Sequence, residues 1–112
     1  MIKELIGLSK IFKSRFTVEF KNGAISQYSN SKKPYIVAYK TIITITDKEV
    51  IYNHINDLPL NCVIGGWLDG DNNTYYIELN KVFKLKSKAL LYAKKYNQKA
   101  IYNLKTEEVI NV

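Results

Sequence analysis

At two places in this amino-acid sequence, residue pairs or triplets typical of tight turns are flanked by segments with the pattern of β-strands. Apolar and polar residues alternate from Phe16 to Phe20, just before Asn22-Gly23, and this is the period of a strand with one buried face. Asn-Gly accepts positive φ at both centres of a two-residue turn, so the pair predicts a β-hairpin. The segment GGWLDGDNNTYYIELN, residues 65–80, repeats the arrangement around a glycine between two aspartates and predicts a second hairpin.

Other strand patterns extend this sheet. YIVAYKTIITIT, residues 35–46, is β-branched and aromatic throughout, which predicts one long strand or two strands joined by a bulge. KAIYNL, residues 99–104, predicts a last clear strand, and EEVINV, residues 107–112, predicts a short addition. Because side chains alternate along a strand, one face of the second hairpin is expected to carry Tyr75, Ile77 and Leu79, and the other Tyr76, Glu78 and Asn80.

Helices are expected in three places. The first dozen residues predict a short helix or an irregular arm. TDKE, residues 46–49, has the form of a capping box and predicts a helix that ends at Pro59. The apolar face of that helix is expected to contain Val50, Ile51, His54, Ile55 and Leu58. Ser87 is expected to cap a further helix that ends at a left-handed Asn97. Its buried stripe is expected to contain Ala89, Tyr92, Ala93 and Tyr96.

These segments predict an α+β fold in a single domain of residues 1–112, since domains usually contain about 100 to 200 residues. The expected architecture is a mostly antiparallel sheet of two hairpins plus extra strands, with two short helices packed on it. Within the domain, residues 63–112 are expected to form a β-β-α-β module. The 46% hydrophobic and 24% charged content is typical of a globular chain rather than a disordered one.

The net charge of +7 is distributed unevenly along the chain. Residues 1–46 carry +6, residues 47–80 carry −5, and residues 81–112 carry +6. No acidic side chain occurs between Lys81 and Lys105. Such asymmetry indicates an acidic partner for the basic segments. The alternative is a solvated lysine-rich surface, and a coding bias toward lysine would produce the same composition.

Lysines and tyrosines together predict a nucleic-acid interface, because bases stack on aromatic rings while ammonium groups meet phosphate. Arg15 is the only arginine beside 16 lysines, which disfavours sequence-specific base reading. The candidate residues for binding nucleic acid or a partner are Lys81, Lys84, Lys86, Lys88, Lys94, Lys95, Lys99, Tyr76 and Tyr102. Tyr92 and Tyr96 are expected to pack into the core instead.

Catalytic and metal-binding patterns are weak. Asp69, Asp71 and Asn73 match the first three positions of a calcium loop, but the required glycine and closing glutamate are missing. We therefore expect a hairpin turn and no metal. The lone Cys62 excludes an internal disulfide, and nothing near it or His54 predicts a catalytic pair. The expected protein is not an enzyme and needs no cofactor.

The surroundings of Gly65-Gly66 and Trp67 allow two interpretations. The glycines admit the close approach of a ligand or another backbone, or they form a bulge that directs Trp67 into the core. No apolar run is long enough for a membrane span, and the N-terminal segment lacks the pattern of a signal peptide. We expect a cytoplasmic protein of a bacterial host, with no membrane partner and with homo-oligomerisation open.

The second half of the chain resembles a known type of module. GGWLD, YYIEL and the run NQKAIYNLKTEEVI, within residues 63–110, are similar to a module in small accessory proteins of phages, plasmids and other mobile elements. Several small phage proteins of this size inhibit host defences, including CRISPR effectors. The resemblance implies a mobile-element setting and an anti-CRISPR-like counter-defence role, and it carries no catalytic residues.

The leading hypothesis is a non-enzymatic accessory protein that binds nucleic acid, or a nucleic-acid-handling host complex, through its lysines and tyrosines. Inhibition of a CRISPR effector is the corresponding biological role. One alternative is a protein-only inhibitor that uses the acidic middle segment, represented by Asp57, Asp69, Asp71 and Glu78. Another is a sponge that sequesters a small phosphorylated nucleotide in an aromatic–lysine pocket.

Overall fold

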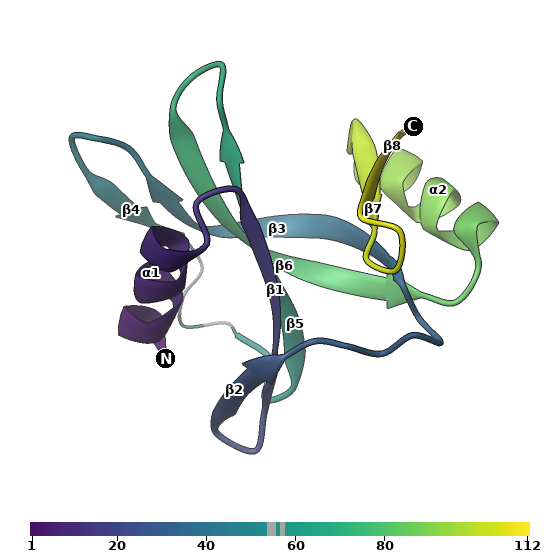
Figure 1. Cartoon of the computed structure of the whole chain (residues 1–112), viewed down its shortest axis with the longest axis horizontal. Coiled ribbons are helices and arrows are strands. Elements are labelled where there is room, and N and C mark those ends of the chain that lie inside the picture. Colours follow the sequence, from purple (N-terminus) through teal and green to yellow (C-terminus); the bar gives the residue numbers. More distant parts are fainter. Residues whose placement is uncertain (54–55, 57) are drawn as a thin grey trace.

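The computed structural model describes residues 1–53, 56 and 58–112. Within these residues the chain forms one eight-stranded sheet and two helices (Figure 1). In chain order the elements are α1 (Ile2–Ile11), β1 (Arg15–Lys21), β2 (Ala24–Gln27), β3 (Tyr35–Ile45), β4 (Val50–Tyr52), β5 (Cys62–Asp69), β6 (Thr74–Phe83), α2 (Lys86–Lys95), β7 (Ala100–Asn103) and β8 (Glu108–Asn111). The α+β class is confirmed.

All strand pairs are antiparallel, and the strand order is β2-β1-β5-β6-β3-β7-β8, with β4 paired to β3. The Asn-Gly hairpin is confirmed: Asn22 has φ 53°, Gly23 has φ 78°, and the strands on either side pair directly. The second hairpin is also confirmed, because Asp69 pairs with Thr74 across the turn between β5 and β6. Local turn chemistry thus sets two of the sheet's connections.

Strand β3 is the long central strand, and it contains two irregularities. β6 pairs along one side of it, while β7 and β4 pair with its two ends on the other side. The register with β6 shifts between Ala38 and Lys40 and again between Thr41 and Ile43. The expectation of a bulged long strand is therefore confirmed. A bulge adds one residue to a strand and bends it, and here the adjacent Ile42 and Ile43 are both fully buried.

The core lies on one face of the sheet, and both helices cover that face. On β6, Tyr75, Ile77 and Leu79 are buried, as the alternation predicted. Leu5 of α1 packs on them, together with Phe16 of β1. A second cluster beneath α2 contains Val37, Ala89, Ala93 and Ile101. Val37 pairs with Lys81, so it points to the same face as Leu79. Figure 1 places α1 and α2 at opposite ends of the molecule.

The prediction of a helix after Thr46 is wrong, because Val50–Tyr52 forms strand β4. The Thr46 side chain does accept a hydrogen bond from Glu49 N–H (3.1 Å), as at a helix start. However, Thr46 N–H donates to the Glu49 carbonyl (2.9 Å), which closes a hairpin turn instead. β-branched Val50 and Ile51 then pair with β3 and remain exposed. His54, Ile55 and Asp57, which the prediction also involved, lie outside the described residues.

Helix α2 departs from the prediction at its start and in its buried stripe, where Ala89 and Ala93 are buried but Tyr96 is exposed. The helix begins at Lys86 with Leu85 as N-cap, and no side chain caps it, so Ser87 is not the cap. Asn97 has φ 56°, and the next residue's amide, Gln98 N–H, donates to the Ala93 carbonyl (2.8 Å). This left-handed C-terminal closure is the one that the sequence predicted.

Candidate nucleic-acid interface

Aromatic rings and ammonium groups meet where α2 packs on β3 and β6. The Tyr92 and Tyr96 rings stack at 4.5 Å between centroids, and Tyr39 meets Tyr96 edge-on at 6.3 Å. Lys95 Nζ lies 5.7 Å from the Tyr96 ring centroid, and Lys81 Nζ lies 5.7 Å from that of Tyr39. We call these five residues the tyrosine–lysine cluster. Both ammonium groups are within the range of cation–π attraction.

Each member of the cluster is positioned by its own element. Tyr92 and Tyr96 are four residues apart, so they stack on one side of α2. Tyr39 occupies the first β-bulge of β3, which brings its ring to the helix. Phe83, at the end of β6, packs against Tyr92 at 5.2 Å. Tyr96 is 40% exposed, so it offers ring surface to a ligand.

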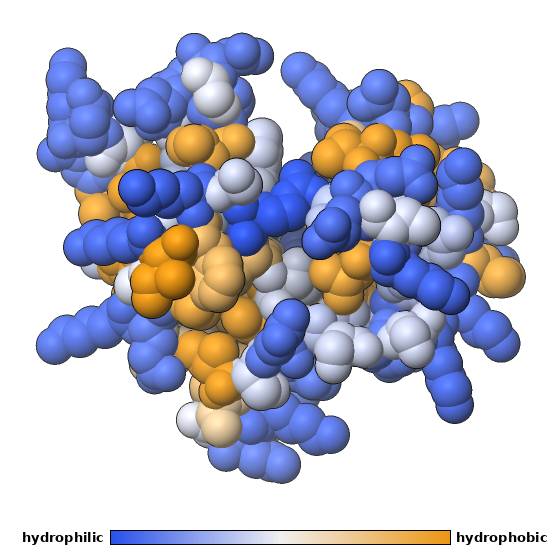
Figure 2. All heavy atoms as spheres, in the orientation of Figure 1, coloured by the Kyte–Doolittle hydropathy of each residue, from blue (hydrophilic) through white to orange (hydrophobic). Residues whose placement is uncertain are grey.

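The electrostatics of this region are positive without local compensation. Lys84, Lys86, Lys88 and Lys94 are exposed on or just before α2. Among the described residues the only ion pair joins the Met1 amino group to Glu4, at the other helix. Hydrophilic side chains project around the whole outline of the molecule in Figure 2, including the end that carries α2.

The Tyr92 and Tyr39 hydroxyls of the cluster add no negative charge. Burial, followed by the neighbouring Tyr96 and Tyr39, raises the pKa of Tyr92 to about 12. Burial also raises the pKa of Tyr39, with smaller effects from Cys62 and Tyr96. Both phenols therefore remain neutral at physiological pH, and an anion that approaches the cluster meets only lysine charge.

The structure does not bring all the sequence-predicted residues together. Tyr76 and Tyr102 lie on the sheet face opposite the helices, which we call the open face. Tyr76 packs against Trp67 there, with the rings tilted and their centroids 5.2 Å apart, and Tyr102 lies beneath Arg15, whose guanidinium carbon is 3.8 Å from the ring centroid. Of the seven predicted lysines, Lys99 is the one that lines the same cavity as Tyr102.

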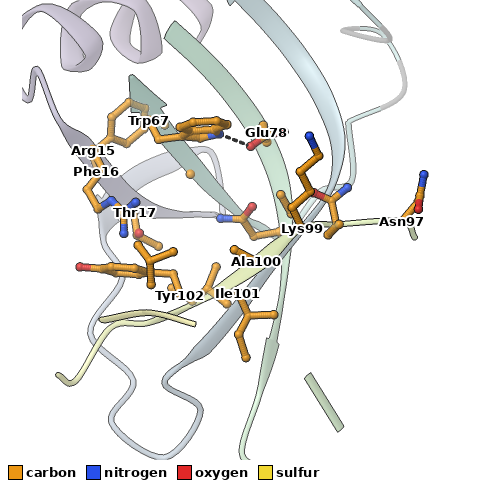
Figure 3. Close-up of a pocket in the computed structure, with 17 residues that line it drawn as sticks. Arg15, Phe16, Thr17, Trp67, Glu78, Asn97, Lys99, Ala100, Ile101 and Tyr102 are labelled. Carbon is orange, nitrogen blue, oxygen red and sulfur yellow. Dashed lines mark hydrogen bonds between the residues drawn. The ribbon is translucent and has the colours of Figure 1, made fainter. Parts of the chain in front are cut away.

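That cavity occupies the open face and has a volume of about 510 Å³. The sheet curls so that β1 approaches β7, and Arg15 contacts Tyr102 across the space between them. In Figure 3, Trp67 lies on one side and Tyr102 on the other, with Arg15 near one end and Lys99 near the other. Trp67 therefore does not point into the core, and it is 37% exposed.

Glu78 is the carboxylate of this cavity. Its Oε1 accepts a hydrogen bond from Trp67 Nε1 (2.6 Å), and its Oε2 accepts one from Thr41 Oγ1 (3.2 Å). Burial raises the pKa of Glu78, and the two hydrogen bonds partly oppose that rise. When the Glu78 carboxyl group is ionised, two hydrogen-bond donors stabilise it, and it has no ion-pair partner among the described residues.

The two glycines beside Trp67 form the floor of the cavity. A side chain on Gly65 would meet the Asn80 amide, and one on Gly66 would meet the Phe16 ring. When the Asn80 amide is oriented to satisfy both partners, its oxygen accepts a hydrogen bond from Gly65 N–H at 3.1 Å. The bulge interpretation is wrong, because β5 pairs with β1 and β6 without a register shift, and the groups that approach the glycines are the Asn80 and Phe16 side chains.

The described acidic residues named for the middle segment lie at the β5–β6 turn and in the cavity. Asp69 and Asp71 lie at the β5–β6 turn, where Asp69 Oδ1 accepts a hydrogen bond from Asp71 N–H (3.1 Å). Glu78 faces the cavity instead, and Asp57 lies outside the described residues. In the described part of the chain, no three His, Cys, Asp or Glu side chains are placed to hold a metal ion. Burial raises the pKa of the Cys62 thiol, which makes it less reactive.

The sequence indicates the lysines of α2 but not the rings that lie beside them. It predicts that Tyr92 and Tyr96 pack inward, and it places Tyr39 only within a strand. The spacing of Tyr92 and Tyr96 by four residues, with lysines on either side, is the signal that could have indicated a stacked pair. The position of Tyr39 depends on a long-range bulge and had no such signal.

Among the described helices, none has the length and apolar content needed to cross a membrane. Comparisons of the chain with protein-family models, with curated proteins and with solved structures gave no match.

Proposed function

We propose that this protein binds single-stranded nucleic acid through the tyrosine–lysine cluster and the surrounding lysines of α2. The strand is either free or held in a nucleic-acid-handling complex. The observation that supports this most directly is the chain of ring contacts from Tyr39 through Tyr96 to Tyr92, with Lys81 and Lys95 beside the rings. The absence of acidic residues from Lys81 to Lys105 keeps this region attractive to phosphate.

A single strand fits this surface better than a duplex does. Only unpaired bases can place a ring face against Tyr96, because the bases of a duplex are already stacked on one another. Lysine ammonium groups are hydrated point charges, so they attract phosphate without fixing a sequence. The proposed binding is therefore tolerant of sequence and sensitive to salt.

The proposed activity is binding without catalysis. The cluster contains no nucleophile or general base, since Tyr92 and Tyr39 keep their protons at neutral pH. The resemblance of residues 63–110 to modules of mobile elements supports a counter-defence role, in which the protein occupies the nucleic-acid path of a host CRISPR effector.

Charge reversal on α2 tests the proposal. We expect replacement of Lys88, Lys94 and Lys95 by glutamate to weaken binding of a fluorescently labelled single strand at least about tenfold, because each reversal replaces attraction to phosphate with repulsion. Fluorescence anisotropy at low salt measures this loss.

The matched control reverses three lysines at the opposite end of the molecule. Lys3, Lys10 and Lys13 lie on or just after α1, and all three are exposed. The same net change of charge there should alter binding by no more than about twofold if the interface is local. Equal losses in the two triple variants, or no loss in the α2 variant, would show that α2 is not the interface.

A further inference from the structure

The open-face cavity has the features of a ligand site that the tyrosine–lysine cluster does not use. Its volume of about 510 Å³ is within the range of small-molecule pockets, which usually measure about 300 to 1,000 Å³. Apolar surface forms most of its wall, and a few polar groups converge on it. The three that matter are Arg15, Trp67 and Glu78, which come from three neighbouring strands.

Arg15 supplies an anion anchor. It is the only arginine of the chain, and its guanidinium carbon lies over the Tyr102 ring, 3.8 Å from the centroid. This contact with the ring leaves N–H groups of the guanidinium available to an anion. Within the described residues Arg15 forms no ion pair. A planar fork of N–H donors held in this way is suited to a bidentate contact with phosphate.

Glu78 supplies a paired acceptor at the other side of the Trp67 ring. Its two oxygens each accept one hydrogen bond from the protein, from Trp67 and from Thr41. A carboxylate has about four lone-pair sites, so each oxygen can accept a further donor. Figure 3 shows the indole between Arg15 and Glu78, with its N–H directed at the carboxylate.

Trp67 supplies the stacking surface. Its indole packs on Tyr76 at 5.2 Å, which holds the ring in place, and the rest of the ring borders the cavity. Gly65 and Gly66 line the cavity beside it, and the Asn80 amide lies against Gly65. A flat ring of a ligand can therefore lie against the indole.

We propose that the cavity binds a guanine nucleotide unit, with the base stacked on Trp67, its Watson–Crick edge hydrogen-bonded to Glu78, and its phosphate bound to Arg15. Guanine presents two adjacent N–H donors on that edge, and they match the two oxygens of a carboxylate. Adenine and cytosine place a ring nitrogen acceptor beside their amino group, and uracil has one N–H between two carbonyls, so each repels one carboxylate oxygen. This inference deepens the proposed function. It rests on that function when the guanine nucleotide is part of a nucleic-acid strand.

The fluorescence of Trp67 reports on this site selectively, since it is the only tryptophan of the chain. Titration with the four common nucleoside monophosphates should give saturable quenching by GMP, with affinity at least about tenfold above that of AMP, CMP or UMP. Guanosine, which lacks the phosphate, should bind at least about tenfold more weakly than GMP. Equal affinity for GMP and AMP, or no quenching by GMP, overturns the inference.

Two variants assign the contacts. Glu78→Gln replaces one acceptor with a donor, so it should remove the preference for GMP over AMP while the fold is retained. Arg15→Gln should bring the affinity for GMP down to that for guanosine. The matched controls, Glu49→Gln and Lys13→Gln, change the same charges at exposed positions outside the cavity and should bind GMP as the wild type does. A Glu78→Gln variant that keeps the preference for GMP overturns the inference.

Three further measurements distinguish this inference from the proposed function. The Lys88, Lys94 and Lys95 charge-reversal variant should still bind GMP, because those lysines do not line the cavity. If the wild type binds a single strand but does not bind GMP, the cavity inference is rejected and the proposed function is retained. A single strand with a terminal 5′-phosphorylated guanosine that displaces GMP identifies the strand as the source of the unit. Quenching by GMP without such displacement supports the cavity as a site for the free nucleotide.

Discussion

Single residues determine how the open face responds to pH. Burial raises the pKa of Glu78 above its ordinary value of 4.5, while hydrogen bonds from Trp67 and Thr41 limit that rise. The other charged groups that line the same cavity are Arg15 and Lys99, and neither forms an ion pair with Glu78. Because a raised pKa means that the folded state holds this proton more tightly than the unfolded state, folding and protonation of Glu78 are linked.

The linkage predicts a pH-dependent difference in stability between the wild type and Glu78→Gln. The contribution of Glu78 is fully present below pH 4.5 and is lost as the pH rises through the raised pKa. The wild type should therefore lose stability relative to the variant over that interval. Thermal unfolding of both proteins from about pH 4 to about pH 8 measures the difference. A difference that stays constant over this range, or that changes equally in Glu49→Gln, would contradict the assignment.

Gly66 is a second position at which a single residue affects the stability of the fold. A methyl group there meets the ring of Phe16, which is buried in the core, so Gly66→Ala should destabilise the fold by about 1–3 kcal/mol. Gly70 has no atom within 4 Å of the same added methyl, and Gly70→Ala is the matched control. Urea unfolding of the two variants should separate them clearly, and equal stabilities would show that the Phe16 ring yields without cost.

Tyr96 is the exposed ring of the tyrosine–lysine cluster, so its removal tests stacking directly. Tyr96→Leu should weaken single-strand binding by about 1–3 kcal/mol, the usual contribution of one stacked base, while Tyr96→Phe should bind as the wild type does. Tyr52→Leu is the control, because Tyr52 is exposed at 53% on β4 and lies outside the cluster. Anisotropy measurements in which all three variants bind equally would exclude Tyr96 as a stacking surface.

At the scale of elements, the sequence predicted structures that depend on a few neighbouring residues. It did not predict structures that depend on pairing with distant strands. The Asn22-Gly23 hairpin follows from the φ preferences of two residues. The Thr46–Glu49 motif forms the expected hydrogen bond from an amide to Thr46, yet the chain turns back as a strand. The edge of β3 is available for pairing at that point, and this competing interaction is invisible in the local sequence.

The C-terminus of α2 gives an element-level prediction. Asn97 adopts φ 56°, a conformation that glycine adopts without cost and that alanine resists by about 1–2 kcal/mol. Asn97→Ala should therefore lower the free energy of unfolding by about 1 kcal/mol, and Asn97→Gly should leave it unchanged or raise it slightly. Equal destabilisation by both substitutions, measured by urea unfolding, would mean that the asparagine side chain and not its backbone conformation stabilises this end.

At the scale of the whole molecule, the curled sheet decides which residues meet. Arg15 and Tyr102 are far apart in sequence, and they touch only because β1 and β7 approach each other across the cavity. The sequence indicated where the lysines of α2 lie, since helical spacing is a local property. It could not indicate that Tyr76 and Tyr102 lie on the opposite face from those lysines, because that depends on strand order and register.

The lysines of α1 lie apart from those of α2, because the two helices occupy opposite ends of the molecule (Figure 1). The central claim, that α2 carries a phosphate-binding surface, is tested most directly by the salt dependence of single-strand binding. If about five lysines contact phosphate, the logarithm of the association constant should fall with the logarithm of salt concentration at a slope of about −3.5. The α2 charge-reversal variant should give a much shallower slope than the α1 variant. Binding that is unchanged from low to high salt, or absent at micromolar protein, would contradict the claim.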